Sequence, residues 1–241
     1  MSNYSFNYNQ YKKRITKSSQ MPFSVIFLLI IVLLGVACFI GNPKKRIETF
    51  YFLEVDCFFN YSDANACANE ISALNAGGYV YFNGKYHVLA CAYLNEADAN
   101  KAKENIKQEY PNAQVFTLST HKFNENNFTE KEVDEISTVI NANYETIKNI
   151  YNLIIRCDTN TINENEIERE LENLNKNYSN KVDGFKTLFR NNKKFTKEKE
   201  LVSKFSSCLA QNSSLTNISQ SLKYNLIKIS ILHYSFLECF C

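Results

Sequence analysis

The chain is poor in the residues on which most enzyme motifs depend. It has only six glycines and three histidines in 241 residues. It contains no GxSxG, P-loop or GxGxxG motif, and His87, His121 and His233 belong to no HExxH or Cys/His pattern. The eight cysteines form no CxxC pair and no metal-ligand cluster. These absences predict a protein that is not an enzyme and that uses no metal or other cofactor.

Excess positive charge is confined to the start of the chain. Residues 1–46 hold seven Lys or Arg and no acid, residues 47–121 hold four Lys and nine Asp or Glu, and residues 122–241 hold sixteen of each sign. Nucleic-acid binding requires a basic face on the folded part of a protein. We therefore expect no nucleic-acid partner, and the basic N-terminal charge suits anionic membrane headgroups.

One long apolar run without charge extends from Met21 to Gly41. At about 1.5 Å per residue, a helix of this length crosses a hydrocarbon core of about 30 Å. Four basic residues precede the run and three follow it, so the positive-inside rule favours a cytoplasmic N-terminus. We predict a cytoplasmic tail over 1–20 and a single-pass transmembrane helix over 21–41 in the cell membrane, with the later domains extracytoplasmic. The alternative is a lipoprotein signal at Leu34-Gly35-Val36-Ala37-Cys38, which also places those domains outside.

The next segment alternates between strand and helix patterns. Phe50 to Phe58 is aromatic and β-branched with partial alternation, which indicates a strand. Asn83-Gly84 is a strong signal for a two-residue hairpin turn, and Asn95 is a suitable helix N-cap. The predicted elements are a strand over 50–58, a helix from 62 to the glycines at 77 and 78, strands over 79–82 and 85–94, a helix from 95 to near Pro111, and a strand over 113–118. This βαββαβ order predicts two helices on one face of a four-stranded antiparallel sheet, whose other face is open.

The C-terminal half has a helical pattern. Thr129 and Glu132 form a capping box, and apolar residues follow at three-to-four spacing from Val133 to Ile154. Further helices are predicted over 164–188, 196–209 and 215–240. The last is very apolar, but charged and polar residues interrupt it, so we expect the central helix of a bundle rather than a second membrane span. The fold class is therefore α+β: a ferredoxin-like βαββαβ module over 47–121 and a helical domain over 127–241, behind one transmembrane helix.

The βαββαβ module also carries a residue pattern beyond its topology. The pattern comprises Leu53 to Phe58, Asp63-Ala64, Ala68, Leu74, Gly78-Tyr79, Lys85-Tyr86-His87-Val88 and Ala97 to Ile106. Over about 70 of the 241 residues it resembles the SPOR domain, an extracytoplasmic module that binds peptidoglycan, particularly glycan strands stripped of their stem peptides. Glu54 and Asp56-Cys57 stand where the family has Gln and Gly-Ser. His87 and Cys91-Ala92 replace its Arg and Gly-Pro.

This resemblance implies that the open sheet face binds glycan. Tyrosine rings would meet sugar faces, and carboxylates and an imidazole would hydrogen-bond sugar hydroxyls. The candidate glycan-binding residues are Glu54, Asp56, Cys57, Tyr79, Tyr81, His87 and Leu89. The implied function is membrane-anchored binding of peptidoglycan glycan strands at division or sporulation septa, with the helical domain free to recruit a protein partner. The alternative is a non-catalytic interaction scaffold that has lost glycan binding. Burial of Tyr79, Tyr81 and His87 beneath the helices would favour this alternative.

Two residue pairs on the strands raise further hypotheses. Cys57 and Cys91 end the first and third strands, which we expect to be parallel neighbours, so a disulfide is one hypothesis. The alternative is that two small residues ease a crowded strand end. Glu54 and Asp56 share a strand face by simple alternation, as an acid–base pair for glycoside hydrolysis would require. Two strand carboxylates without an enclosing cleft are more often solvated, which is a second reason to expect no catalysis.

Overall fold

A long aromatic strand lies inside a four-stranded antiparallel sheet. The computed structural model describes residues 48–120, 123–210 and 217–241, so the predicted transmembrane segment over 21–41 lies outside the described residues. The strands are β1 (Thr49–Phe58), β2 (Tyr79–Phe82), β3 (Tyr86–Tyr93) and β4 (Gln114–Ser119). Their order in the sheet is β2-β3-β1-β4, and each neighbouring pair is antiparallel. The predicted α+β class with a four-stranded antiparallel sheet is confirmed.

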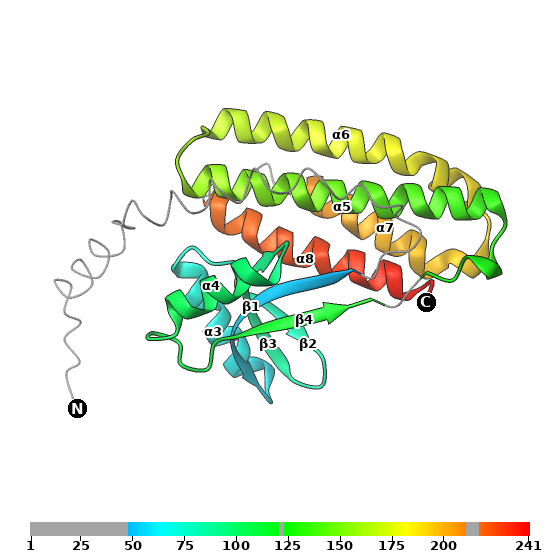
Figure 1. The fold of residues 1–241 in the computed structure, drawn as a ribbon. Helices are drawn as coiled ribbons and strands as arrows, with labels where there is room; N and C mark the ends of the chain where they lie inside the picture. Colours follow the sequence, from blue (N-terminus) through cyan, green and yellow to red (C-terminus); the bar gives the residue numbers. More distant parts are fainter. Residues whose placement is uncertain (1–47, 121–122, 211–216) are drawn as a thin grey trace, which may run out of the picture. The chain divides into compact units, whose positions relative to one another are not determined.

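Two helices cover one face of this sheet. α3 (Tyr61–Ala73) and α4 (Glu96–Ile106) begin at the N-caps Asn60 and Asn95, whose side chains accept hydrogen bonds from backbone N–H groups of the first turn. α3 buries Ala64, Ala68 and Ile71 against residues of β1 and β3. The alanines keep this helix close to the sheet, and Figure 1 shows both helices on the same side of it.

The pairing of β1 with β3 corrects one expectation. The two strands are antiparallel, not parallel, because the Asn83-Gly84 hairpin reverses the chain after the β1–α3–β2 crossover has preserved its direction. Cys57 therefore pairs with His87 while Cys91 pairs with Leu53, which places the two cysteines at different levels of the ladder. Both thiols are free, and the hypothesised disulfide does not form.

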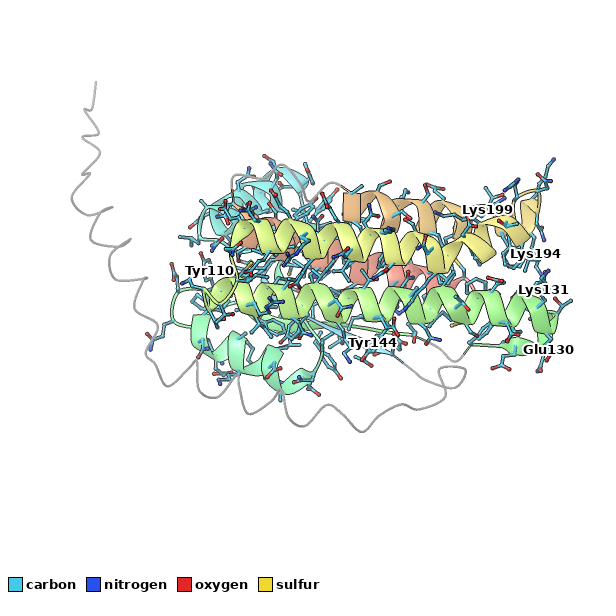
Figure 2. All side chains as sticks on the ribbon, turned by 90° about the horizontal axis from the view of Figure 1, so that it is seen from above. Tyr110, Glu130, Lys131, Tyr144, Lys194 and Lys199 are labelled. Carbon is cyan, nitrogen blue, oxygen red and sulfur yellow. The ribbon has the colours of Figure 1, made fainter. Side chains whose placement is uncertain are left out.

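Four longer helices follow the sheet. They are α5 (Glu130–Asp158), α6 (Glu164–Leu188), α7 (Thr196–Ala210) and α8 (Ile218–Glu238), with short 3-10 turns over Glu125–Asn127 and Lys193–Phe195. The capping box of Thr129 and Glu132 at the start of α5 is present as predicted. α5 and α6 lie side by side and antiparallel, and an ion pair between Arg156 and Glu170 at 2.8 Å joins them (Figures 1 and 2).

α8 lies between the sheet and the other long helices, in contact with both (Figure 1). Its buried residues surround the helix, and they are Leu222, Asn225, Leu226, Ile227, Ile229, Ser230, Ile231, His233, Phe236 and Leu237. A helix that is apolar on every side is typical of a core position. Among the described residues, no helix is both long and apolar enough to cross a membrane. The helix is buried as predicted, but it lies between the other long helices and the sheet instead of at the centre of the bundle, and it covers the sheet face that we expected to be open.

The sheet and the long helices share one hydrophobic core. Phe50, Phe52 and Leu89 of the sheet belong to the same buried cluster as Ile147 of α5 and Ile227 of α8. The described residues accordingly fall within one compact unit. The predicted boundary between 121 and 127 thus separates two layers of one core. An isolated 47–121 fragment would expose the apolar face on which α8 packs.

Candidate functional site

A break in the β1–β3 ladder determines which side chains share the α8 side of the sheet. Glu54 pairs with Leu89 and Asp56 with Val88, so Val55 is an additional residue on β1. Such a bulge shifts the alternation of side chains by one residue. Glu54 consequently lies on the face shared with Leu89. Asp56 is paired with Val88, which belongs to the cluster under α3.

Glu54 is a buried carboxylate with a partner for each oxygen. The residue is fully buried, His87 Nδ1 lies 2.9 Å from one carboxylate oxygen, and Gln114 Nε2 donates to the other at 2.9 Å. An ionised carboxylate away from water is costly unless donors surround it, and these two side chains meet that requirement. Because Nδ1 is engaged with Glu54, Nε2 is the ring nitrogen of His87 that remains for an external partner.

Three rings pack together beside this carboxylate. The His87 ring centroid lies 4.6 Å from Phe116 and 6.3 Å from Tyr81, and Tyr81 lies 5.7 Å from Phe116. The His87 side chain is 13% exposed, while Tyr81 and Phe116 are half-buried at the edge of the shared core. We call Glu54, Tyr81, His87, Gln114 and Phe116 the face cluster. It combines aromatic rings with hydrogen-bonding groups from all four strands.

α8 removes two predicted residues from this surface. Leu89 is fully buried, and Tyr79 packs against Tyr224 of α8 with ring centroids 5.2 Å apart. Burial and then the neighbouring Tyr224 raise the pKa of Tyr79 to about 12. The expected open face is therefore only partly open, because α8 occupies the part next to Tyr79 and Leu89.

Asp56 does not lie with the other predicted glycan-binding residues. Its carboxylate accepts hydrogen bonds from Asn112 Nδ2 at 3.1 Å and from the backbone N–H of Cys57 at 2.7 Å. The expectation that Glu54 and Asp56 share a strand face is wrong, because the extra residue Val55 separates their partners. Glu54 is also buried rather than solvated.

Cys57 lies beside Glu54 and is a weak nucleophile in this position. Burial, and next the charge of Glu54, raise the pKa of the Cys57 thiol above its ordinary value. The reactive form of cysteine is the thiolate, so a raised pKa reduces its reactivity at neutral pH. Among the described residues no group of three or more His, Cys, Asp or Glu side chains is arranged to hold a metal ion.

Basic side chains at the α6–α7 connection serve the fold. Figure 2 shows Lys194 and Lys199 at the same end of the helices as Lys131. Lys194 lies 5.0 Å from the centre of the Phe128 ring, and the Lys199 ammonium donates to the backbone carbonyls of Arg190 and Asn192. These contacts stabilise the connection between the helices.

Two members of the face cluster, Gln114 and Phe116, were not predicted from the sequence. Both lie on β4, two residues apart, and β4 pairs with β1 so that Gln114 is opposite Glu54 and Phe116 opposite Phe52. Alternation within 113–118 places them on one face with Leu118. Whether that face is the one toward α8 or the one toward α3 depends on which strand pairs with β4. The local sequence pattern does not reveal the pairing partner.

Comparison with known proteins gives no match to this chain: no family model, no curated protein and no solved structure matches it.

Proposed function

We propose that the chain is a membrane-anchored, non-catalytic protein that binds peptidoglycan glycan strands at division or sporulation septa. Residues 21–41 would anchor it with the N-terminus in the cytoplasm, and the βαββαβ module would be a SPOR-type domain outside. The layout of an anchor followed by this module is similar to that of stage II sporulation protein B. The face cluster would be the part of the sheet that meets the sugar.

The observation that carries this proposal is the composition of the face cluster. Rings of Tyr81, His87 and Phe116 lie within 4.6 to 6.3 Å of one another, and Glu54 and Gln114 lie beside them. Sugars present apolar ring faces bordered by hydroxyl groups, so they suit a surface that combines aromatic rings with amide and imidazole groups. The buried carboxylate of Glu54 does not reach this surface, but its hydrogen bonds hold His87 and Gln114 in place. Because α8 covers Tyr79, the surface suits a short stretch of glycan rather than a strand spanning the whole sheet.

A second candidate is the non-catalytic interaction scaffold. The observation that favours it is the contact of Tyr79 with Tyr224, together with the burial of Leu89 beneath α8. In this alternative α8 occupies the sheet face in place of an external ligand, and the helical layer recruits protein partners.

Sedimentation of the purified full-length chain with isolated sacculi, untreated and treated with amidase, tests the proposal. The full chain is needed because the sheet and α8 share a core. The variant His87→Asn retains a side-chain N–H near the position of Nδ1 and removes Nε2 and the ring. We expect retention of the parent protein to rise after amidase treatment, and we expect His87→Asn and Tyr81→Ala to lose most of this gain.

The matched control is Tyr144→Ala on α5, remote from the sheet face in sequence and element. It should bind as the parent protein does. Absence of retention on both kinds of sacculus would reject glycan binding and favour the scaffold. Equal losses in Tyr144→Ala and Tyr81→Ala would show that the face cluster has no special part in binding.

A further inference from the structure

A second group of aromatic residues lies outside the face cluster and is exposed. Phe59 is 84% exposed, Tyr61 57% and Phe82 59%, which is unusual for such large side chains. They come from the turn after β1, the start of α3 and the end of β2. With Lys85 and Tyr86 they form what we call the hairpin patch. Exposed apolar groups gathered in one place commonly mark a binding surface.

Contacts between the rings make the hairpin patch continuous. The Tyr86 centroid lies 4.7 Å from Phe82 and 5.7 Å from Tyr61. The Lys85 ammonium lies 4.7 Å from the centre of the Phe59 ring. Among the described residues, no carboxylate lies within ion-pair distance of Lys85. The patch is therefore an aromatic surface with one available positive charge.

The composition of the hairpin patch suits a sugar ligand. Residues 56–63 and 82–86 contain five aromatic residues, Phe59 among them, together with Asn60, Asn83 and Lys85, and they contain no Leu, Ile, Val or Met. Rings bordered by amides, one ammonium and the carboxylate of Asp63, which Asn60 hydrogen-bonds, suit the alternating apolar faces and polar edges of a glycan.

The hairpin patch also adjoins the face cluster. Phe82 follows Tyr81 on β2 and Tyr86 precedes His87 on β3, and the two pairs are cross-strand partners. Consecutive strand residues point to opposite faces, so the hairpin presents rings on both of its sides. The hairpin patch lies at the C-terminal end of β1. This strand is about 30 Å long at 3.3 Å per residue, so the patch is that far from residue 48, where the described chain begins. A glycan held at the face cluster can therefore continue around the hairpin.

We infer that the hairpin patch is a second glycan subsite that selects stripped strands through Lys85. This inference rests on the proposed function. Hydrolysis of the amide that joins a stem peptide to muramic acid leaves a free carboxylate on the lactyl group, so a stripped strand is an anionic glycan. The aromatic rings of the patch contact the sugar faces, and the Lys85 ammonium pairs with a lactyl carboxylate that an intact strand does not offer.

Binding of the full-length chain to untreated and amidase-treated sacculi, both cleared of protein by protease, tests this subsite. Lys85→Gln should weaken affinity for treated sacculi by about two- to fivefold and leave affinity for untreated sacculi unchanged. Phe82→Ser should weaken binding to treated sacculi by about two- to tenfold. The matched controls are Lys101→Gln on the exposed side of α4 and Leu74→Ser, another exposed apolar residue, and both should bind as the parent protein does.

The outcomes separate this inference from the proposed function. If His87→Asn loses binding while Lys85→Gln and Phe82→Ser bind normally, the face cluster alone binds glycan and the hairpin subsite is rejected. If the parent protein is not retained, both the proposed function and the subsite are rejected. If Lys101→Gln weakens binding as much as Lys85→Gln does, nonspecific charge attraction explains the effect of Lys85 and the subsite is rejected. If the effect of Phe82→Ser appears only on sacculi that keep their proteins, the patch binds a wall protein instead.

Discussion

At the scale of single residues, Glu54 shows how a buried charge is accommodated in this fold. A carboxylate with no exposed surface lies in the sheet, and side chains from β3 and β4 hydrogen-bond its two oxygens. Burial without such partners would be strongly unfavourable. His87 and Gln114 are therefore held by the structure as well as available to a ligand.

Replacing Glu54 with alanine should destabilise the protein. His87 Nδ1 would lose its partner in a largely buried position, and a donor left there without an acceptor costs about 1–3 kcal/mol. Gln114 Nε2 would also lose its acceptor, but this exposed side chain can hydrogen-bond water instead. Urea unfolding measures the change in the free energy of unfolding. Glu70→Ala on the exposed side of α3 is the matched control and should change it by no more than about 0.5 kcal/mol. Equal effects of the two substitutions would contradict the buried network.

Tyr79 should make the stability depend on pH in the alkaline range. Burial and then Tyr224 raise its pKa from 10.0 to about 12 in the folded protein. Between these values the unfolded chain has released a proton that the folded chain keeps, so the free energy of unfolding falls as the pH rises. Below the unfolded pKa this contribution is fully present. Urea unfolding measured across this range should show a smaller decline for Tyr79→Phe than for the parent protein. The exposed control Tyr61→Phe should decline as the parent does.

At the scale of elements, the contact of α8 with the sheet depends on a residue without a side chain. Gly77 lies between α3 and β2, and a Cβ there would be 2.8 Å from Ile227 Cδ1, 3.0 Å from the Ala90 carbonyl oxygen and 3.1 Å from the Tyr224 nitrogen. The loop can therefore approach the α8 backbone closely, and the backbone N–H of Gly77 donates to the Ala90 carbonyl at 2.7 Å. A larger residue would require α8 or the loop to move.

A double-mutant cycle at this contact tests the position of α8. Gly77→Ala should cost about 1–3 kcal/mol through overpacking, and Ile227→Val should cost about 0.5–1.5 kcal/mol. Valine lacks Cδ1, the atom nearest to the added Cβ. The double variant should therefore lose at least about 0.5 kcal/mol less than the sum of the single variants. Additive losses in urea unfolding would mean that α8 does not contact Gly77 in this way.

At the scale of the whole molecule, the shared core makes the sheet and the helices depend on each other. Phe52 and Leu89 pack into the same cluster as Leu226 and Ile227 of α8. Neither layer buries its apolar face without the other. This is the reason to study glycan binding with the complete chain.

The two layers should consequently unfold in one transition. Cys91 in β3 and Cys208 in α7 are both buried free thiols, so their alkylation reports the opening of the sheet and of the helical layer. We expect both to become reactive at the same urea concentration, where helical circular dichroism is also lost. Exposed Cys241 should react without urea and serves as the control. Reaction of Cys91 well before Cys208 would contradict a shared core.

The local elements of this protein were predictable from the sequence. The Asn95 cap and the Thr129–Glu132 capping box act over a few residues, and each is present as predicted. The Asn83-Gly84 signal correctly marked the hairpin between β2 and β3, but Phe82 pairs with Tyr86, so the connection has three residues instead of the predicted two. Periodic apolar residues also predicted the long helices, because burial on one helical face repeats every three to four residues. The predicted helix over 164–188 coincides with α6.

The candidate site was decided only by the tertiary structure. One unpaired residue, Val55, moves Asp56 away from Glu54, and the direction of β3 keeps Cys57 and Cys91 apart. The apolar character of α8 on all sides predicted burial but not the layer that buries it, so the sequence left open whether the helices cover Tyr79, and the structure shows that α8 does. Strand register and helix docking depend on contacts between residues far apart in the chain. Local propensity and periodicity carry no information about them.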